Sequence, residues 1–279
     1  MDVNGDNKLD LLTANNNSNN ISVRLGVGDG TFTAPANSTF AVGAGPYDLA
    51  VGDLNGDQKL DVVAVNNGSS NVSVLLGNGD GTFQGQVSGG ATGAQPNAII
   101  LADFNADQKL DFATADLNGN NATVRLGNGN GGFGVGFSPT GVNMPMDLVA
   151  GDFNSDKKLD LAIANTSTGT IRLALGAGDG SFINAATPAV SAGTSNRSIA
   201  AGDFNLDGYL DLAVTNVAVS NISILLGSGD GTFATMVPFT VGTQPSHISV
   251  ADVNNDGLLD LLTTDQSAGA AVVRLSQCL

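Results

Sequence analysis

Residues 53–61 read DLNGDQKLD, and this stretch decides the fold because close copies of it return five more times. The copies begin at Asp2, Asp103, Asp152, Asp203 and Asp252, so that successive copies are 51, 50, 49, 51 and 49 residues apart. A second marker, LGNGDGTF from Leu76, recurs in the same register as LGVGDGTF, LGNGNGGF, LGAGDGSF and LGSGDGTF. Two markers with one period indicate an internal repeat.

The hydrophobic pattern within the second repeat predicts four strands, at 48–53, 60–66, 71–77 and 82–89. An Asp-rich loop, the turn NNGSSN and a Gly-Asp-Gly hairpin turn connect them in that order. Four-stranded sheets that repeat every 40 to 50 residues are typical of propeller blades. The predicted fold class is therefore all-β, a β-propeller of six blades, each with four antiparallel strands.

The two terminal repeats are expected to form incomplete blades. The sequence opens on the first Asp loop and ends after the third strand of the last repeat, which leaves 22 strands. We expect a single propeller domain over 1–279, with repeats at about 1–45, 46–95, 96–144, 145–195, 196–244 and 245–279. A fragment of a seven-bladed propeller is the alternative.

Composition excludes several classes of protein. The net charge is −16, and all 26 acidic residues are Asp, which argues against a nucleic-acid partner and against helical bundles. One Cys, Cys278, and one His, His247, are too few for a zinc site of nitrogen and sulfur ligands or for a nucleophilic triad. No apolar run approaches the ~20 residues of a membrane-spanning helix. We therefore expect a non-enzymatic protein without a membrane span.

The Asp loop has the pattern of a metal site. Positions 1, 3, 5 and 9 carry carboxylate or amide oxygens, and position 7 offers its backbone carbonyl, a donor set that suits a hard cation. Asp and Asn also cap turns, but turn capping does not explain three Asp at this spacing six times. The candidate ligands are Asp2, Asn4, Asp6, Lys8 and Asp10; Asp53, Asn55, Asp57, Lys59 and Asp61; Asp103, Asn105, Asp107, Lys109 and Asp111; Asp152, Asn154, Asp156, Lys158 and Asp160; Asp203, Asn205, Asp207, Tyr209 and Asp211; and Asp252, Asn254, Asp256, Leu258 and Asp260.

Calcium is the expected ion. Five protein oxygen donors in one loop exceed what Mg²⁺ usually accepts. The six loops hold 18 ligand Asp, and six divalent ions would reduce the net charge from −16 to −4. Up to six Ca²⁺ are therefore predicted, one in each loop.

The Asp loops and the LGxGDGTF turns together resemble the FG-GAP repeats, also called VCBS repeats, of integrin α-subunit propellers and of a fungal propeller lectin. The resemblance covers essentially the whole chain and implies a propeller with Ca²⁺ between the first and second strands of each blade. The chain departs from the motif at loop position 6, which is Gly only at Gly208 and Gly257. If that position needs a positive φ, Asn7, Gln58, Gln108 and Lys157 make their loops weaker sites.

Two further sets of residues are candidates for ligand contact. Asn-rich loops, such as 15–20 and 66–71, are expected at the end of each blade opposite the Asp loops, either as solvated turns or as a ligand face. Asp48, Asp147 and His247 share one position at the start of the innermost strand.

These observations favour a calcium-binding, non-catalytic propeller that acts as a binding or adhesion module for a protein or cell-surface ligand. Millimolar-calcium sites place it outside the cell or at the cell surface. A calcium-stabilised lectin that binds glycans is the alternative, although the chain has no Trp and only Tyr47 and Tyr209 for sugar stacking. A part of a polysaccharide-active enzyme is the third hypothesis. The oligomeric state and the identity of the ligand stay open.

Overall fold

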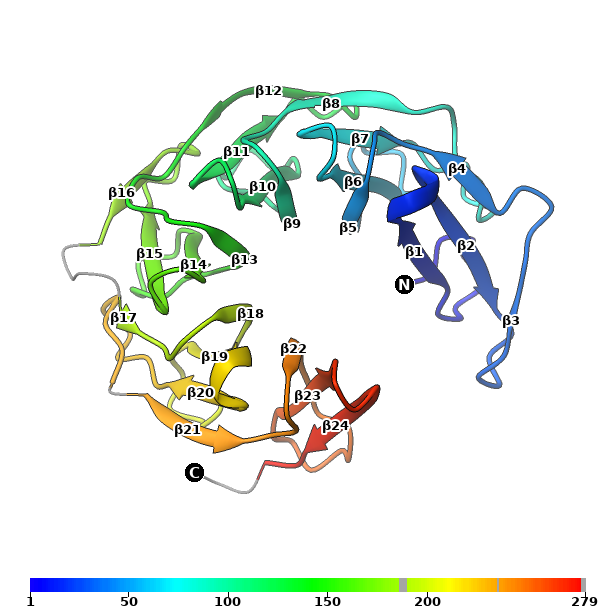
Figure 1. The fold of residues 1–279 in the computed structure, drawn as a ribbon. Coiled ribbons are helices and arrows are strands. Elements are labelled where there is room, and N and C mark those ends of the chain that lie inside the picture. The colour runs from blue at the N-terminus through cyan, green and yellow to red at the C-terminus, as the bar shows by residue number, and fades with distance from the viewer. Residues whose placement is uncertain (186–189, 235, 277–279) are drawn as a thin grey trace. The chain divides into compact units, whose positions relative to one another are not determined.

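The computed structural model describes residues 1–185, 190–234 and 236–276, so Cys278 and the end of the sixth repeat lie outside the described residues. The chain divides into two compact units, Met1–Phe137 and Ser138–Leu279. Each unit contains three small antiparallel sheets of the propeller-blade type (Figure 1). The fold class is therefore all-β with six blades, as the repeat predicts.

The first unit holds blades 1 to 3, each within one predicted repeat. Their strands are β1 (Leu11–Asn15), β2 (Asn20–Gly26), β3 (Phe32–Thr33) and β4 (Thr39–Ala41); β5 (Pro46–Gly52), β6 (Asp61–Asn66), β7 (Asn71–Leu75) and β8 (Val87–Ala91); and β9 (Pro96–Ala102), β10 (Asp111–Asp116), β11 (Asn121–Gly127) and β12 (Phe133–Phe137). The short 3-10 helix η1 (Asn16–Ser18) links β1 to β2.

The second unit holds blades 4 to 6. Their strands are β13 (Pro145–Gly151), β14 (Asp160–Asn165), β15 (Thr170–Gly176), β16 (Phe182–Asn184) and β17 (Val190–Ser191); β18 (Asn196–Gly202), β19 (Asp211–Asn216), β20 (Asn221–Leu225) and β21 (Val237–Thr240); and β22 (Pro245–Ala251), β23 (Asp260–Asp265) and β24 (Ala270–Arg274). A second 3-10 helix, η2 (Val217–Val219), follows β19. No helix among the described residues is long and apolar enough to cross a membrane.

Both terminal blades are incomplete, as expected. Blade 1 lacks an innermost strand, and blade 6 consists of the three strands β22, β23 and β24 among the described residues. The described residues form 24 strands rather than the expected 22, because the outermost strand is split into β3 and β4 in blade 1 and into β16 and β17 in blade 4.

The predicted fourth strand of the second repeat begins too early in the sequence. Phe83 makes only an isolated bridge with Gly77, and regular pairing resumes at Val87. The outermost strand has one neighbour and is Gly-rich, so little holds the chain in the ladder just after the hairpin.

The core lies between neighbouring blades. All six residues of each of the second strands β6, β10, β14 and β19 are buried. The innermost strands are crowded, since a Cβ on Gly52 would lie 2.4 Å from Leu110 Cδ1 of the next blade. Leu110 stands at position 8 of the third Asp loop and packs against a buried cluster that includes Leu54 and Phe112, so it anchors this loop in the core.

Backbone crowding at the end of the third strand predicts a large effect of one methyl group. A Cβ on Gly77 would lie 2.2 Å from the carbonyl oxygen of Leu60, whereas a Cβ on Gly85 would meet nothing within 4 Å. We expect Gly77→Ala to lower the free energy of unfolding by about 3 kcal/mol, and Gly85→Ala to change it by less than about 0.5 kcal/mol. Urea unfolding measures both, and equal effects of the two substitutions would contradict this packing.

Candidate metal centre

In blades 2 to 6 the Asp loop connects the first strand to the second, and in all six loops the backbone wraps around the carboxylate at position 1. In blade 2, Asp53 Oδ1 accepts the N–H groups of Asn55, Gly56 and Asp57 at 2.7–3.2 Å. Asp53 Oδ2 accepts the N–H of Gln58 at 2.8 Å. Burial acts to raise the pKa of Asp53, but these backbone donors outweigh it and hold the pKa below 3.8. The charged carboxylate therefore organises the loop.

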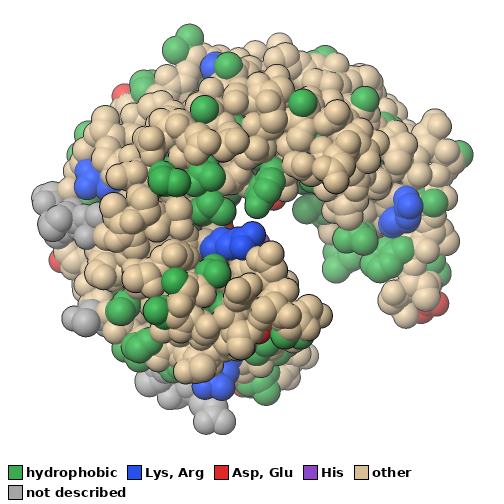
Figure 2. All heavy atoms as spheres, in the orientation of Figure 1, with side chains coloured by type: hydrophobic (Ala, Val, Ile, Leu, Met, Phe, Trp, Pro, Cys, Tyr) green, Lys and Arg blue, Asp and Glu red, His purple; other side chains and the backbone are tan. Residues whose placement is uncertain are grey.

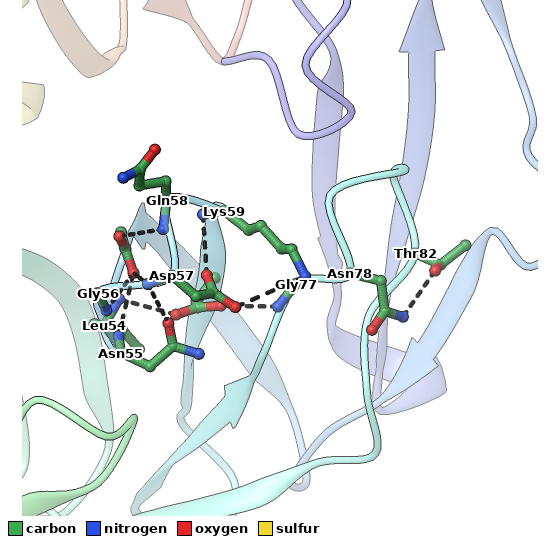
Figure 3. Close-up of polar contacts among 11 residues, drawn as sticks. Leu54, Asn55, Gly56, Asp57, Gln58, Lys59, Gly77, Asn78 and Thr82 are labelled. Atoms are coloured by element: carbon green, nitrogen blue, oxygen red, sulfur yellow. Dashed lines mark hydrogen bonds and ion pairs between the residues drawn. The ribbon is translucent and has the colours of Figure 1, made fainter.

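Positions 3 and 5 form further side-chain turns. Asn55 Oδ1 accepts the N–H of Asp57 at 3.0 Å, and Asp57 Oδ1 accepts the N–H of Lys59 at 3.0 Å (Figure 3). The bond from position 7 to position 5 occurs in all six loops, whose donors are Lys8, Lys59, Lys109, Lys158, Tyr209 and Leu258. The loops are thus repeated copies of one geometry.

Two residues of every loop adopt the left-handed conformation. Position 6 has φ between +61° and +87°, at Asn7, Gln58, Gln108, Lys157, Gly208 and Gly257. Position 4 also has a positive φ, at Gly5, Gly56, Ala106, Ser155, Leu206 and Asn255. Position 6 therefore does require a positive φ, the condition under which loops without Gly at this position were expected to be weaker sites. A positive φ costs Gln and Lys more than Gly.

The carboxylate at position 9 has a different role. Asp61 is fully buried, its Oδ2 accepts the N–H of Leu54 and its Oδ1 accepts the N–H of Gly77, both at 2.8 Å. The same two contacts occur in all six loops at 2.7–3.0 Å, through Asp10, Asp61, Asp111, Asp160, Asp211 and Asp260. Position 9 therefore ties the Asp loop to the start of the hairpin after the third strand.

The three carboxylates of a loop influence each other. Burial, with a smaller contribution from the charges of Asp156 and Asp152, raises the pKa of Asp160 to about 6 against two backbone hydrogen bonds. The pKa values of Asp61, Asp111 and Asp211 are raised for the same reasons. Burial is the largest cause in each case, and the charges of the two other Asp of the same loop are a smaller one. A cation beside these side chains would relieve that repulsion.

The second oxygen at position 5 has a cationic neighbour in four loops. Lys8, Lys59, Lys109 and Lys158 lie 3.2–3.9 Å from it as partly exposed ion pairs of little energetic value. In the last two loops, which have Tyr209 and Leu258 instead, the Asn at position 3 donates to that oxygen at 2.9 Å.

The donor chemistry of the loops fits a hard cation. The Oδ2 atoms of Asp53 and Asp57 and both oxygens of Asp61 accept at most one backbone N–H each, which leaves them lone pairs for a cation. The described residues contain no group of three or more His, Cys, Asp or Glu side chains already gathered as a metal cluster. Completing a site would therefore draw on the Asn at position 3 and the carbonyl at position 7. The first loop has the same geometry although no innermost strand precedes it.

The residues at the start of the innermost strands join neighbouring blades. Asp48 Oδ2 accepts the N–H of Ile99 at 3.0 Å, and Asp147 Oδ2 accepts the N–H of Ile199 at 3.1 Å and the hydroxyl of Ser198 at 2.8 Å. Ser198 Oγ also lies 3.2 Å from His247 Nδ1. Ser198, which was not predicted from the sequence, shares the repeat position of Asp48, Asp147 and His247.

Side chains of the Asn-rich loops form hydrogen bonds with neighbouring residues of the fold. Asn67 Nδ2 donates to Asn97 Oδ1 of the next blade at 2.6 Å, and Asn118 Nδ2 donates to Gln95. Figure 2 shows a face of the molecule made mostly of backbone and uncharged polar side chains, with few acidic ones. Asn67 and Asn118 therefore make structural contacts.

The model of the FG-GAP-like repeat family matches the chain at 2–64, 53–114, 103–163, 152–214 and 207–263. No curated protein sequence matches it. Among solved structures, a lectin of Agrocybe aegerita that recognises non-reducing terminal N-acetylglucosamine is similar at 17% identity and a TM-score of 0.64, over 93% of this chain and 72% of the lectin.

Two bacterial structures are similar to the same degree. A protein of Bacteroides fragilis, provisionally a 6-phosphogluconolactonase, shares 16% identity at a TM-score of 0.62, over 94% of this chain and 82% of its own. A protein of unknown function from Desulfotomaculum acetoxidans shares 14% identity at a TM-score of 0.59, over 94% of this chain and 77% of its own. At these identities the likeness concerns the fold alone.

The raised pKa values predict how the metal-free chain responds to pH. A carboxyl such as Asp160, whose pKa is higher in the folded than in the unfolded chain, stabilises the fold below about pH 4, and this contribution is lost as the pH rises towards 6. A carboxyl with a lowered pKa, such as Asp53, has the opposite effect. It stabilises the fold above about pH 3.8 and loses this contribution as the pH falls below that value. We expect the urea midpoint of dialysed, metal-free protein to fall between pH 4 and pH 6.5. A midpoint that rises over this interval would contradict the repulsion among the loop carboxylates.

Proposed function

Since this chain belongs to the FG-GAP-like repeat family, we propose that it is a calcium-binding, non-catalytic propeller module that binds a partner outside the cell. The observation that carries the proposal is the Asp loop itself. Three carboxylates and one amide oxygen stand within nine residues, at the same spacing in all six copies. In the second to fifth loops burial, and then the carboxylates at positions 1 and 5, raise the pKa of the one at position 9.

Backbone geometry supports a binding role for the loops. Leu206 and Lys157 adopt left-handed φ of +60° and +67°, which is costly for side chains of this kind. Strained backbone is retained where the surrounding structure or a ligand compensates for it, and it gathers at ligand sites. Loops five and six have Gly at position 6 and no Lys at position 7, so we propose that they bind Ca²⁺ most tightly.

The non-catalytic assignment rests on the side chains available. The chain has no Glu, one His and one Cys, which leaves Asp as its only carboxylate for acid–base chemistry. The Asp at position 9 is committed to two backbone N–H groups in each loop. A role in binding or adhesion to a protein or cell-surface ligand remains the favoured function, in a compartment with millimolar Ca²⁺.

A glycan-binding function is the second candidate, favoured by the similarity in fold to the Agrocybe aegerita lectin. Tyr47 and Tyr209, the only Tyr residues, are 47% and 43% exposed, so each offers a ring to a sugar. A glycan array separates the two functions, since specific glycan signals support a lectin and their absence supports a protein ligand.

Each loop should bind one ion independently of the others. Asp57→Ala removes a ligand from the second loop alone, so we expect calorimetry to show one Ca²⁺ fewer per chain. Asp80→Ala is the matched control, because Asp80 belongs to a hairpin turn in which it accepts the N–H and hydroxyl of Thr82. Loss of all calcium binding in Asp57→Ala, or loss of one ion in Asp80→Ala, would refute independent Asp loops.

Folding should be coupled to calcium. At a tenfold excess over Kd, each site stabilises the native state by about 1.4 kcal/mol, and six sites by about 8 kcal/mol. Total stability is typically only ~5–15 kcal/mol. We therefore expect the Tm in excess EGTA to lie far below the Tm in millimolar Ca²⁺, with poor rescue by Mg²⁺. Superimposable unfolding curves in the two buffers would identify the Asp loops as turn caps.

A further inference from the structure

The chain contains seven Asn–Gly pairs, a chemically labile sequence. The backbone nitrogen that follows an Asn can attack the carbon of its side-chain carboxamide, and Gly hinders this attack least because it has no Cβ. The Asn residues of the seven pairs are Asn4, Asn55, Asn67, Asn78, Asn118, Asn128 and Asn130. Since the dipeptide is the same in every pair, differences in reactivity among them must come from the fold.

In five of the pairs a hydrogen bond holds the N–H of the Gly. Gly5 and Gly56 stand at position 4 of an Asp loop, and each donates to the carboxylate of position 1 at 2.7 Å. The other three donate to backbone carbonyls at 2.9–3.2 Å, in the contacts of Gly68 with Ala44, Gly119 with Ala94 and Gly131 with Leu54. A nitrogen held in this way becomes free to react only when its loop opens locally. The fold therefore protects these five pairs.

The N–H groups of Gly79 and Gly129 are not held. Across the described part of the chain, no group accepts a hydrogen bond from either of them. Both glycines lie in the hairpin turn after a third strand, with φ of +81° and +76°, and each follows an exposed Asn that water can reach. Exposure does not single out these two pairs, because Asn118 is exposed as well. The free N–H does.

The side chains of the same two pairs are folded back over the hairpin turn. Asn78 Nδ2 donates to Thr82 Oγ1 at 2.9 Å (Figure 3). Asn128 Oδ1 accepts the N–H of Asn130 at 3.3 Å and that of Gly132 at 3.2 Å. Each carboxamide is therefore kept beside the turn that contains the attacking nitrogen, which favours the intramolecular reaction.

We propose that Asn78 and Asn128 are modification sites, which deamidate in the folded chain while the other five Asn–Gly pairs stay intact. The Gly nitrogen loses its proton and forms a bond to Cγ of the Asn, and the carboxamide nitrogen leaves as ammonia. Water then opens the resulting succinimide. Cleavage of the bond to Cγ gives aspartate, and cleavage of the bond to the backbone carbonyl carbon gives isoaspartate.

At Asn78 the new carboxylate would lie beside two Asp loops. Asn78 lines a cavity of about 240 Å³ together with Asp2, the first residue of the first Asp loop, and Lys59 of the second loop. The reaction adds a negative charge at this cavity, where Lys59 is the cation that can pair with it. Deamidation therefore changes the charge between the Asp loops of blades 1 and 2 without any change in the sequence of the gene.

Peptide mapping by mass spectrometry of the full chain, incubated in Ca²⁺ buffer at mildly alkaline pH, tests the proposal. We expect aspartate and isoaspartate to form at Asn78 and Asn128 at least about tenfold faster than at Asn67 and Asn118. A factor of ten corresponds to about 1.4 kcal/mol, which is within the range of one hydrogen bond. In chain unfolded by urea, all seven pairs should react at similar rates.

Matched variants separate the effect of the fold from that of the sequence. Asn78→Ser introduces the residue that blade 5 has at this place, Ser228, and should abolish the reaction there while leaving Asn128 unchanged. Asp53→Ala removes the acceptor of the Gly56 N–H, so the reaction at Asn55 should become at least about tenfold faster. Equal rates at Asn67, Asn78 and Asn118 in the folded chain would overturn the proposal. An unchanged rate at Asn55 in Asp53→Ala would also overturn it, because the hydrogen bond would then not be what protects a pair.

Discussion

The buried carboxylate at position 9 of each Asp loop is the interaction on which the rest of each blade depends. It accepts one N–H from the start of its own loop and another from the residue that follows the third strand. Because Asp61 is fully buried, replacing it would leave two backbone donors without partners, each costing about 1–3 kcal/mol. This single side chain therefore fixes both connections at one end of the blade, where the hairpin must meet the preceding blade.

That arrangement explains why the loops are suited to a cation. The position-9 carboxylate is held in the core by packing and hydrogen bonds, and the carboxylates at positions 1 and 5 are held near it by the turns of the loop. Their charges raise the pKa of Asp160 in addition to the effect of burial, which is a cost to the folded chain at neutral pH. We propose that a divalent ion turns this repulsion into attraction, so that metal binding would stabilise the blade.

The repeat period made the blades, their strand order and the incomplete terminal blades predictable. In the sequence, an Asp loop precedes the second strand of each blade and a hairpin turn follows the third strand. The outermost strand of the second repeat was misplaced, since its exposed, Gly-rich segment 82–89 carries little hydrophobic signal. The sequence also showed the Asp at position 9 but not its two backbone partners. The packing of Phe204, Ile224 and Phe239 between blades 5 and 6 could not be predicted, because these residues belong to different strands and loops. Spacing along the chain does not reveal such neighbours.

The central claim is that six Asp loops are metal centres rather than turns stabilised by hydrogen bonds alone. A crystal structure of the chain grown in Ca²⁺ and measured near a wavelength where calcium scatters anomalously tests this most directly. The account predicts one anomalous peak in each Asp loop, coordinated by the side chains of positions 1, 3, 5 and 9 and by the carbonyl of position 7. Loops that keep the backbone hydrogen bonds of Asp53 and Asp57 with no anomalous peak among their oxygens would contradict it.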